Sequence, residues 1–190
     1  MARQRCVYTL PLGNGFVRAY VTSGIEVSHA GQSDAQVAVG SRVVTPRLPF
    51  GRFIADAYLL DRYRNYLNPL VSLGGADRLR GYRPQAFVGP NAAVVNFEFR
   101  SRPIQILTVQ TGVAAFYDMG DTGSDMAHIQ LRHGVGGGLR LAFPQIQRSV
   151  FRIDFGVPLN PNDPAAGANV VARFEQAFDV PAIASPGLVQ

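Results

Sequence analysis

The alternation of apolar and polar residues with a period of two constrains the fold of this chain more than any other feature of its sequence. Successive residues of a strand point to opposite sides, so this spacing places the apolar side chains on one face. Clusters of Gly, Pro, Asn and Asp interrupt the alternation at intervals of roughly ten to fifteen residues, and helical spacing is hard to find anywhere. The sequence therefore predicts an all-β fold.

We expect one domain of nine strands over residues 1–178, followed by a carboxy-terminal tail at 179–190. No internal repeat or second domain is visible. The strands are expected near residues 3–11, 16–28, 35–46, 50–64, 91–102, 106–119, 131–144, 148–158 and 169–178.

The connections between these strands alternate in length. Short ones fall at 12–15, 45–51, 101–105 and 143–148, and long ones at 26–34, 65–90, 118–128 and 156–169. Short turns on one side and long loops on the other indicate an antiparallel up-and-down meander, which is typical of transmembrane β-barrels. A soluble, lipocalin-like barrel that binds a small apolar ligand is the competing interpretation.

The two faces of the predicted strands help to choose between these barrels. Phe151, Ile153 and Phe155 oppose Arg152 and Asp154, and similar apolar rows oppose charges and glycines on other strands. Opposite charges and glycines fit a crowded polar lumen, which leaves the apolar rows facing lipid. We therefore expect a transmembrane antiparallel up-and-down β-barrel in the bacterial outer membrane.

The charge of the chain comes from arginine alone. All 18 basic residues are arginine and none is lysine, and the net charge is +5. Arginine offers a planar fork of donors that suits ion pairs inside a barrel. The arginines are spread singly along the chain without an aromatic-interleaved stripe, so the sequence argues against nucleic acid as a partner.

The sequence gives no sign of enzyme chemistry, a cofactor or a metal. Cys6 is the only cysteine, and the histidines at 29, 128 and 133 lack ligand spacing. Asp118, Asp121 and Asp125 faintly resemble a calcium loop but lack its closing glutamate. No signal peptide follows Met1, so either the protein is cytosolic or its natural beginning lies upstream.

The long connection at 65–90 contains a candidate site around Arg80. Solvation is the plainest interpretation of an arginine in a loop. The predicted polar faces, however, offer Phe116 and Asp118 on one strand, which ends at Gly120, and Gly136, Gly138 and Arg140 on the next. Two glycines on one face leave room for a loop that folds inward, with Arg80 reaching Asp118.

Together these segments resemble the carboxy-terminal part of the barrel in the BamA/TamA superfamily of outer-membrane assembly factors, the bacterial surface antigen family. The resemblance rests on the order of several motifs and is strongest from residue 70 to residue 178. They are Leu79-Arg80-Gly81-Tyr82, Phe116-Tyr117-Asp118-Met119-Gly120, Gly136-Gly137-Gly138-Leu139-Arg140, "FRIDFGVPL" and a last strand ending in Phe178.

The resemblance implies a role for each motif. Leu79, Arg80, Gly81 and Tyr82 would form the docked tip of a loop inside the barrel. The partners on the lumen side would be Phe116, Asp118, Gly120, Gly136, Gly138 and Arg140. The last strand, with Phe174 and Phe178, would carry the family's terminal assembly signal.

The resemblance also implies a function without covalent chemistry, namely assistance to the insertion of membrane proteins or to polypeptide passage across the outer membrane. The expected partners are outer-membrane lipid and nascent outer-membrane or secreted polypeptides, with POTRA domains, accessory lipoproteins or a homo-oligomer as further candidates. Family barrels have more strands than this sequence predicts, so we expect part of a larger or oligomer-closed barrel. A barrel that anchors or exports a fused passenger, such as a lipase domain, is an alternative.

Overall fold

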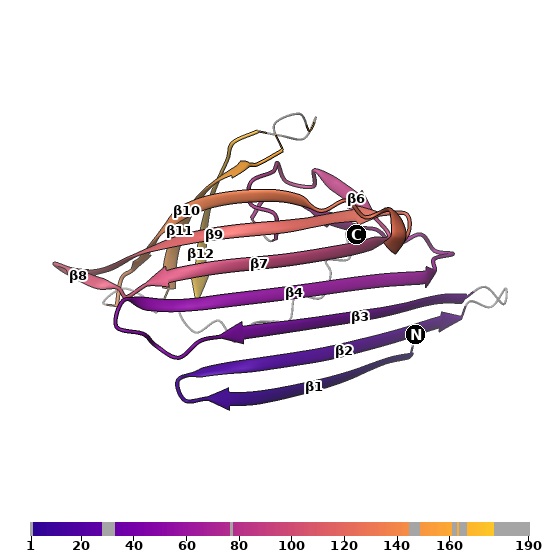
Figure 1. Ribbon diagram of the computed structural model, residues 1–190, viewed down its shortest axis with the longest axis horizontal. Helices are drawn as coiled ribbons and strands as arrows, with labels where there is room; N and C mark the ends of the chain where they lie inside the picture. The colour runs from indigo at the N-terminus through magenta and orange to yellow at the C-terminus, as the bar shows by residue number, and fades with distance from the viewer. Residues whose placement is uncertain are drawn as a thin grey trace.

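A computed structural model of the chain describes residues 2–27, 33–76, 78–144, 149–160, 163 and 167–176. One large antiparallel sheet dominates it (Figure 1). Its order is β1 (Ala2–Leu12), β2 (Gly15–Val27), β3 (Ser33–Val44), β4 (Gly51–Arg64), β7 (Asn91–Ser101), β9 (Val109–Gly123), β10 (Arg132–Ala142), β11 (Ser149–Pro158) and β12 (Asn169–Gln176). Each of these strands pairs with the strands that precede and follow it in this order, which confirms the predicted up-and-down meander.

The nine predicted strands are present, and three short strands are added to them. β5 (Val71–Leu73) and β6 (Phe87–Gly89) pair with each other inside the long 65–90 connection, and β8 (Ile104–Ile106) pairs with the start of β9. The predicted loop at 118–128 was too long, because β9 continues to Gly123 before a single 3-10 turn at Met126–His128. Figure 1 shows β8 and the β1–β2 and β3–β4 connections at one end of the sheet, which we call the short-connection end.

The sheet is open. β1 and β12 form its two edges, and within the described residues neither edge strand has a second partner. Over the described residues the sheet therefore does not close into a barrel. In Figure 1 the sheet curls at its carboxy-terminal side, where β11 and β12 turn behind β9 and β10. Phe178 and the tail at 179–190 lie outside the described residues.

The two faces of the sheet differ sharply in chemistry. We call the face that carries the loop between β5 and β6 the inner face, and the opposite one the outer face. The outer face exposes large apolar side chains on almost every strand, with Phe97, Leu139 and Phe155 at 47%, 44% and 51% exposure. Other exposed residues of this face include Val21, Ile25, Val39, Phe53, Leu59, Val113 and Val170.

The hydrophobic core lies on the inner face and is built around the loop. Leu73, Leu79, Tyr82 and Phe87 from β5, β6 and the loop between them pack against the strands. The residues of the main sheet in this cluster are Tyr20, Ala38, Tyr58, Leu60, Ala92 and Val94. This core packs the loop between β5 and β6 against the inner face of the sheet. Among the described residues, no element covers the apolar side chains of the outer face. No helix in the described part of the chain is long and apolar enough to cross a membrane.

Candidate functional site: a docked loop and its charge network

The loop between β5 and β6 folds back on itself before it meets the sheet. Gly74 and Gly75 have φ angles of 113° and 76°, which favour glycine because it lacks a Cβ. The Gly75 N–H donates to the Tyr82 carbonyl at 2.9 Å, and the Tyr82 N–H donates to the Leu79 carbonyl at 3.2 Å. These bonds form a compact tip with Arg80 and Gly81 at its turn.

The tip is buried against the inner face. Leu79 and Tyr82 are fully buried, and Arg80 is only 4% exposed. The Tyr82 ring packs edge-on against Phe87 with 5.1 Å between ring centroids, and its hydroxyl donates to the His133 carbonyl at 3.2 Å. Apolar anchors therefore flank the arginine on both sides and fix its position.

The Arg80 guanidinium forms a forked contact with Asp118 on β9. Its Nε and Nη2 donate to the two carboxylate oxygens, each at 2.8 Å, and the Arg80 backbone N–H donates to Oδ2 at 3.1 Å. The guanidinium carbon lies 3.6 Å from the centroid of the Phe116 ring, close enough for a cation–π contact. Forked charge-assisted bonds and an aromatic face are arrangements that arginine provides and lysine does not.

Two further carboxylates complete the surroundings of Arg80. Its Nη1 donates to Glu98 Oε2 at 2.5 Å and lies 3.6 Å from Asp154 Oδ2. Glu98 and Asp154 are 8% and 1% exposed. Burying a single charge is costly unless it is paired and hydrogen-bonded, and here one cation faces three carboxylates from three different strands.

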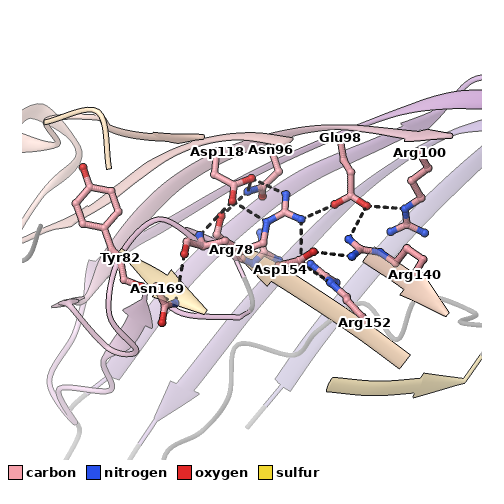
Figure 2. A network of polar contacts seen from close by, with 11 residues as sticks. Arg78, Tyr82, Asn96, Glu98, Arg100, Asp118, Arg140, Arg152, Asp154 and Asn169 are labelled. Carbon is pink, nitrogen blue, oxygen red and sulfur yellow. Dashed lines mark hydrogen bonds and ion pairs between the residues drawn. The ribbon is translucent and has the colours of Figure 1, made fainter. Parts of the chain in front are cut away.

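The same carboxylates also bind other arginines of the inner face (Figure 2). Glu98 accepts from Arg100 Nε at 2.6 Å and from Arg140 Nη2 at 3.4 Å. Asp154 accepts from Arg140 Nη1 and from Arg152 Nε, each at 2.5 Å. The network thus joins β7, β9, β10 and β11 through the tip of the loop.

The electrostatics of this cluster hold Arg80 in its charged form. Burial lowers the pKa of the guanidinium, but the hydrogen bonds and charges of Asp118 and Glu98 outweigh burial and raise the pKa above its ordinary value. The Arg80 guanidinium therefore remains protonated across the ordinary pH range.

Glycines let the backbone of the tip approach the sheet. A Cβ on Gly81 would lie 2.7 Å from the Val157 carbonyl oxygen, and one on Gly156 would lie 2.7 Å from the Arg80 carbonyl oxygen. A Cβ on Gly134 would lie 3.3 Å from the Gly81 Cα. The loop backbone therefore crosses β10 and β11 where both strands carry glycine on the inner face.

The glycines singled out from the sequence have other neighbours. A Cβ on Gly136 would meet the Phe116 ring at 2.2 Å, and one on Gly138 would meet Asp154 Oδ1 at 2.0 Å. These two glycines make room for Phe116 and for the charge network, and the loop itself crosses at Gly134 and Gly156. Gly120 pairs with Val94 of β7 and packs against that strand.

The remaining predicted residues lie at different distances from Arg80. Arg140 does not contact Arg80 but shares Glu98 and Asp154 with it. Phe174 on the edge strand β12 is 77% exposed, and its ring centroid lies 4.7 Å from that of Phe151. Phe178 and His29 lie outside the described residues.

The sequence interpretation did not assign Asn96, Glu98, Asp154 or Asn169 to the site. Asn96 Nδ2 donates to Asp118 Oδ1 at 2.8 Å and also to the Arg78 carbonyl. Asn169 Nδ2 donates to the carbonyls of Arg80 at 3.3 Å and Tyr82 at 3.1 Å. The alternation of apolar and polar residues places Glu98 and Asp154 on the polar face, so the sequence contained a signal for these two carboxylates. Nothing in the sequence near Asn169 indicates that it reaches the loop.

The aspartates that resemble a calcium loop bind protein groups instead. Asp118 is engaged by Arg80, Asp121 forms an ion pair with Arg132, and Asp125 binds the side chain and backbone of His128. Within the described residues, no group of three His, Cys, Asp or Glu side chains is placed to hold a metal ion.

The arrangement as a whole positions the loop between β5 and β6 against the inner face. It clamps one loop to four strands through a buried arginine, a network of shared carboxylates and two apolar anchors. No protein-family model matches the chain, and no curated protein matches its sequence significantly.

Proposed function

We propose that this chain is part of an outer-membrane β-barrel of the assembly and translocation type, similar in function to the BamA/TamA superfamily. In this proposal it assists the insertion of membrane proteins or the passage of polypeptides across the outer membrane. The observation that carries the proposal is the contrast between the two faces of the sheet, with large apolar side chains exposed outside and buried charges inside.

The outer face favours lipid as its environment. Soluble proteins rarely expose extended apolar patches, and here Val21, Val39, Phe97, Leu139 and Phe155 belong to different strands of one face. A barrel in lipid has this apolar-out and polar-in pattern. A soluble barrel that binds an apolar ligand would instead bury these side chains.

The docked loop and the open edges support an assembly role. The Arg80 network braces β7, β9, β10 and β11, so that this part of the sheet is stiffened. The edges at β1 and β12 present backbone donors and acceptors to which a client strand can add by β-augmentation. In this mechanism the rigid part holds its shape while an edge templates the client.

An in vitro folding assay tests this function. The purified chain is incorporated into liposomes, a urea-unfolded outer-membrane barrel is added as client, and its folded fraction is followed over time by heat-modifiable gel migration. We expect faster client folding than with empty liposomes. Arg80→Ala should reduce this acceleration because it removes the centre of the network, whereas Arg83→Ala, an exposed arginine of the same loop, should not.

Two results would contradict the proposal at different levels. If the chain inserts into liposomes but does not accelerate client folding, the assembly role is wrong and a barrel that anchors a passenger explains the fold better. If the chain stays dispersed in buffer without detergent and does not bind liposomes, the membrane assignment is wrong as well.

A further inference from the structure

Arginines face one another across the inner face near the short-connection end of the sheet. The strand register pairs Arg18 with Arg42, Arg52 with Arg100, and Arg140 with Arg152. We call these six residues the arginine row. Like charges directly opposite each other on neighbouring strands are destabilising, so the three pairs of the row need compensation, as does Arg152 where it lies opposite Arg173.

The carboxylates of the inner face compensate the row only in part. Asp56 contacts Arg42 at 2.8 Å, and Glu98 and Asp154 bind Arg100, Arg140 and Arg152. Among the described side chains, these three carboxylates face six arginines, and Glu98 and Asp154 also serve Arg80. Among the described side chains, the row therefore has more arginines than carboxylates.

Several donors of the row lack an acidic partner within the described part of the chain. Arg18 donates only to the Thr9 hydroxyl, at 3.2 Å, and Arg52 has no hydrogen-bond or ion-pair partner there. Arg140 Nε is buried and unpaired, although its other nitrogens are bound. Donors of Arg18 and Arg52 that lack an acidic partner can bind an added oxyanion through charge-assisted hydrogen bonds.

The row is accessible to a ligand at the Arg18–Arg42 and Arg52–Arg100 pairs. The side chains of Arg42 and Arg100 are 33% and 42% exposed. Between the Arg52–Arg100 and Arg140–Arg152 pairs, β9 carries the small residues Gly112 and Ala114, and the side chains of Arg140 and Arg152 are themselves only 13% exposed. Neighbouring strands are about 4.8 Å apart, so a single anion with several oxygens can reach both arginines of a pair.

We propose that the arginine row binds multivalent oxyanions of the phosphate class on the inner face. The planar guanidinium fork matches phosphate oxygens in pairs, and paired arginines on adjacent strands match two phosphate groups in succession. The inner face lies opposite the apolar one, which favours a soluble phosphate compound over a lipid headgroup as the source. This inference needs the fold alone and is independent of client assembly.

Calorimetric titration of the detergent-solubilised chain with inorganic pyrophosphate, at ionic strength held constant with NaCl, tests the site. We expect saturable binding by the unmodified chain. Arg52→Gln should weaken binding at the Arg52–Arg100 pair about tenfold, and Arg18→Gln should do the same at the Arg18–Arg42 pair, because each removes a charge-assisted contact. Neither substitution leaves a carboxylate unpaired, so both variants should fold.

The control is Arg83→Gln, which removes the same charge from an exposed loop position outside the row. It should leave pyrophosphate affinity unchanged. If Arg83→Gln and Arg52→Gln weaken binding equally, the effect comes from net charge alone and the proposed site is wrong. The absence of saturable binding would contradict the proposal as well. Binding to micelles that contain phosphatidic acid, but not to pyrophosphate, would contradict a soluble ligand.

Discussion

Arg80 is held by contacts from residues far apart in the sequence. Its guanidinium is almost completely buried, yet Asp118, Glu98 and Asp154 surround it from three strands. Such a group is stable only while its partners stay in place, because the cost of burying a charge is repaid by geometry and by hydrogen bonds. The residue therefore couples the position of the loop to the register of the sheet.

Asp118→Asn tests this coupling at the residue scale. The amide keeps the shape of the side chain but removes the negative charge of the forked contact. We expect a loss of about 3 kcal/mol in the free energy of unfolding, which is the low end of the usual cost of breaking a buried ion pair. The cost is at the low end because Glu98 and Asp154 remain beside Arg80. Urea unfolding in detergent, followed by tyrosine fluorescence, measures it.

The matched control is Asp125→Asn, because Asp125 is an exposed aspartate that contacts only its local 3-10 turn. It should leave the urea concentration at the midpoint of unfolding unchanged, because exposed ion pairs contribute little to stability. If Asp118→Asn unfolds at the same urea concentration as the unmodified chain, the buried pair does not brace the fold.

At the scale of elements, the loop between β5 and β6 is docked through backbone contacts as well as charge. Gly156→Ala would place a methyl group 2.7 Å from the Arg80 carbonyl oxygen, and backbone atoms cannot yield as a flexible side chain can. We expect the tip to undock while the strands remain paired. Limited trypsin digestion detects this, because the undocked tip exposes the bonds after Arg78 and Arg80.

Gly112→Ala is the control for this substitution. It adds the same methyl group to the inner face of β9, but the nearest atom, Ser101 Oγ, would be 3.6 Å away. Its digestion pattern should equal that of the unmodified chain. Protection of Arg78 and Arg80 in both variants would show that the close approach at Gly156 does not control docking.

The main strands were predictable because each one carries its own period-two pattern and is bounded by Gly, Pro, Asn or Asp. β5, β6 and β8 were missed because three residues are too few to show a period. The extension of β9 from Gly120 to Gly123 was also missed, since pairing with β7 overrides the turn propensity of these residues.

The charges of the site were more predictable than the contacts between them. The period-two alternation of apolar and polar residues placed Asp118 and Arg140 on one face, and the Leu79-Arg80-Gly81-Tyr82 motif indicated Arg80. The crossing point at Gly134 and Gly156 depends on the stagger between β10 and β11, which no local pattern records. Asn169 reaches the loop only because β12 pairs beside β11.

At the scale of the whole molecule, the direction of the edge strands limits how the sheet can close. Nine strands in antiparallel succession leave β1 and β12 running in the same direction. Direct pairing of these two edges would therefore be parallel. An antiparallel closure requires an odd number of additional strands between them, and a barrel in lipid must pair both edges in some way.

The central claim is that the outer face of the sheet contacts lipid and the inner face does not, and spin labels on the two faces test it most directly. Spin labels are attached to Val21→Cys and Phe97→Cys on the outer face, and to Thr22→Cys on the inner face, in a Cys6→Ser background. In liposomes, paramagnetic resonance then measures collisions with oxygen, which is enriched in lipid, and with a water-soluble nickel chelate. The account predicts high oxygen and low nickel accessibility at Val21 and Phe97, and the reverse at Thr22. High nickel accessibility at Val21 and Phe97, or protection of both from either reagent as in a packed protein core, would contradict it.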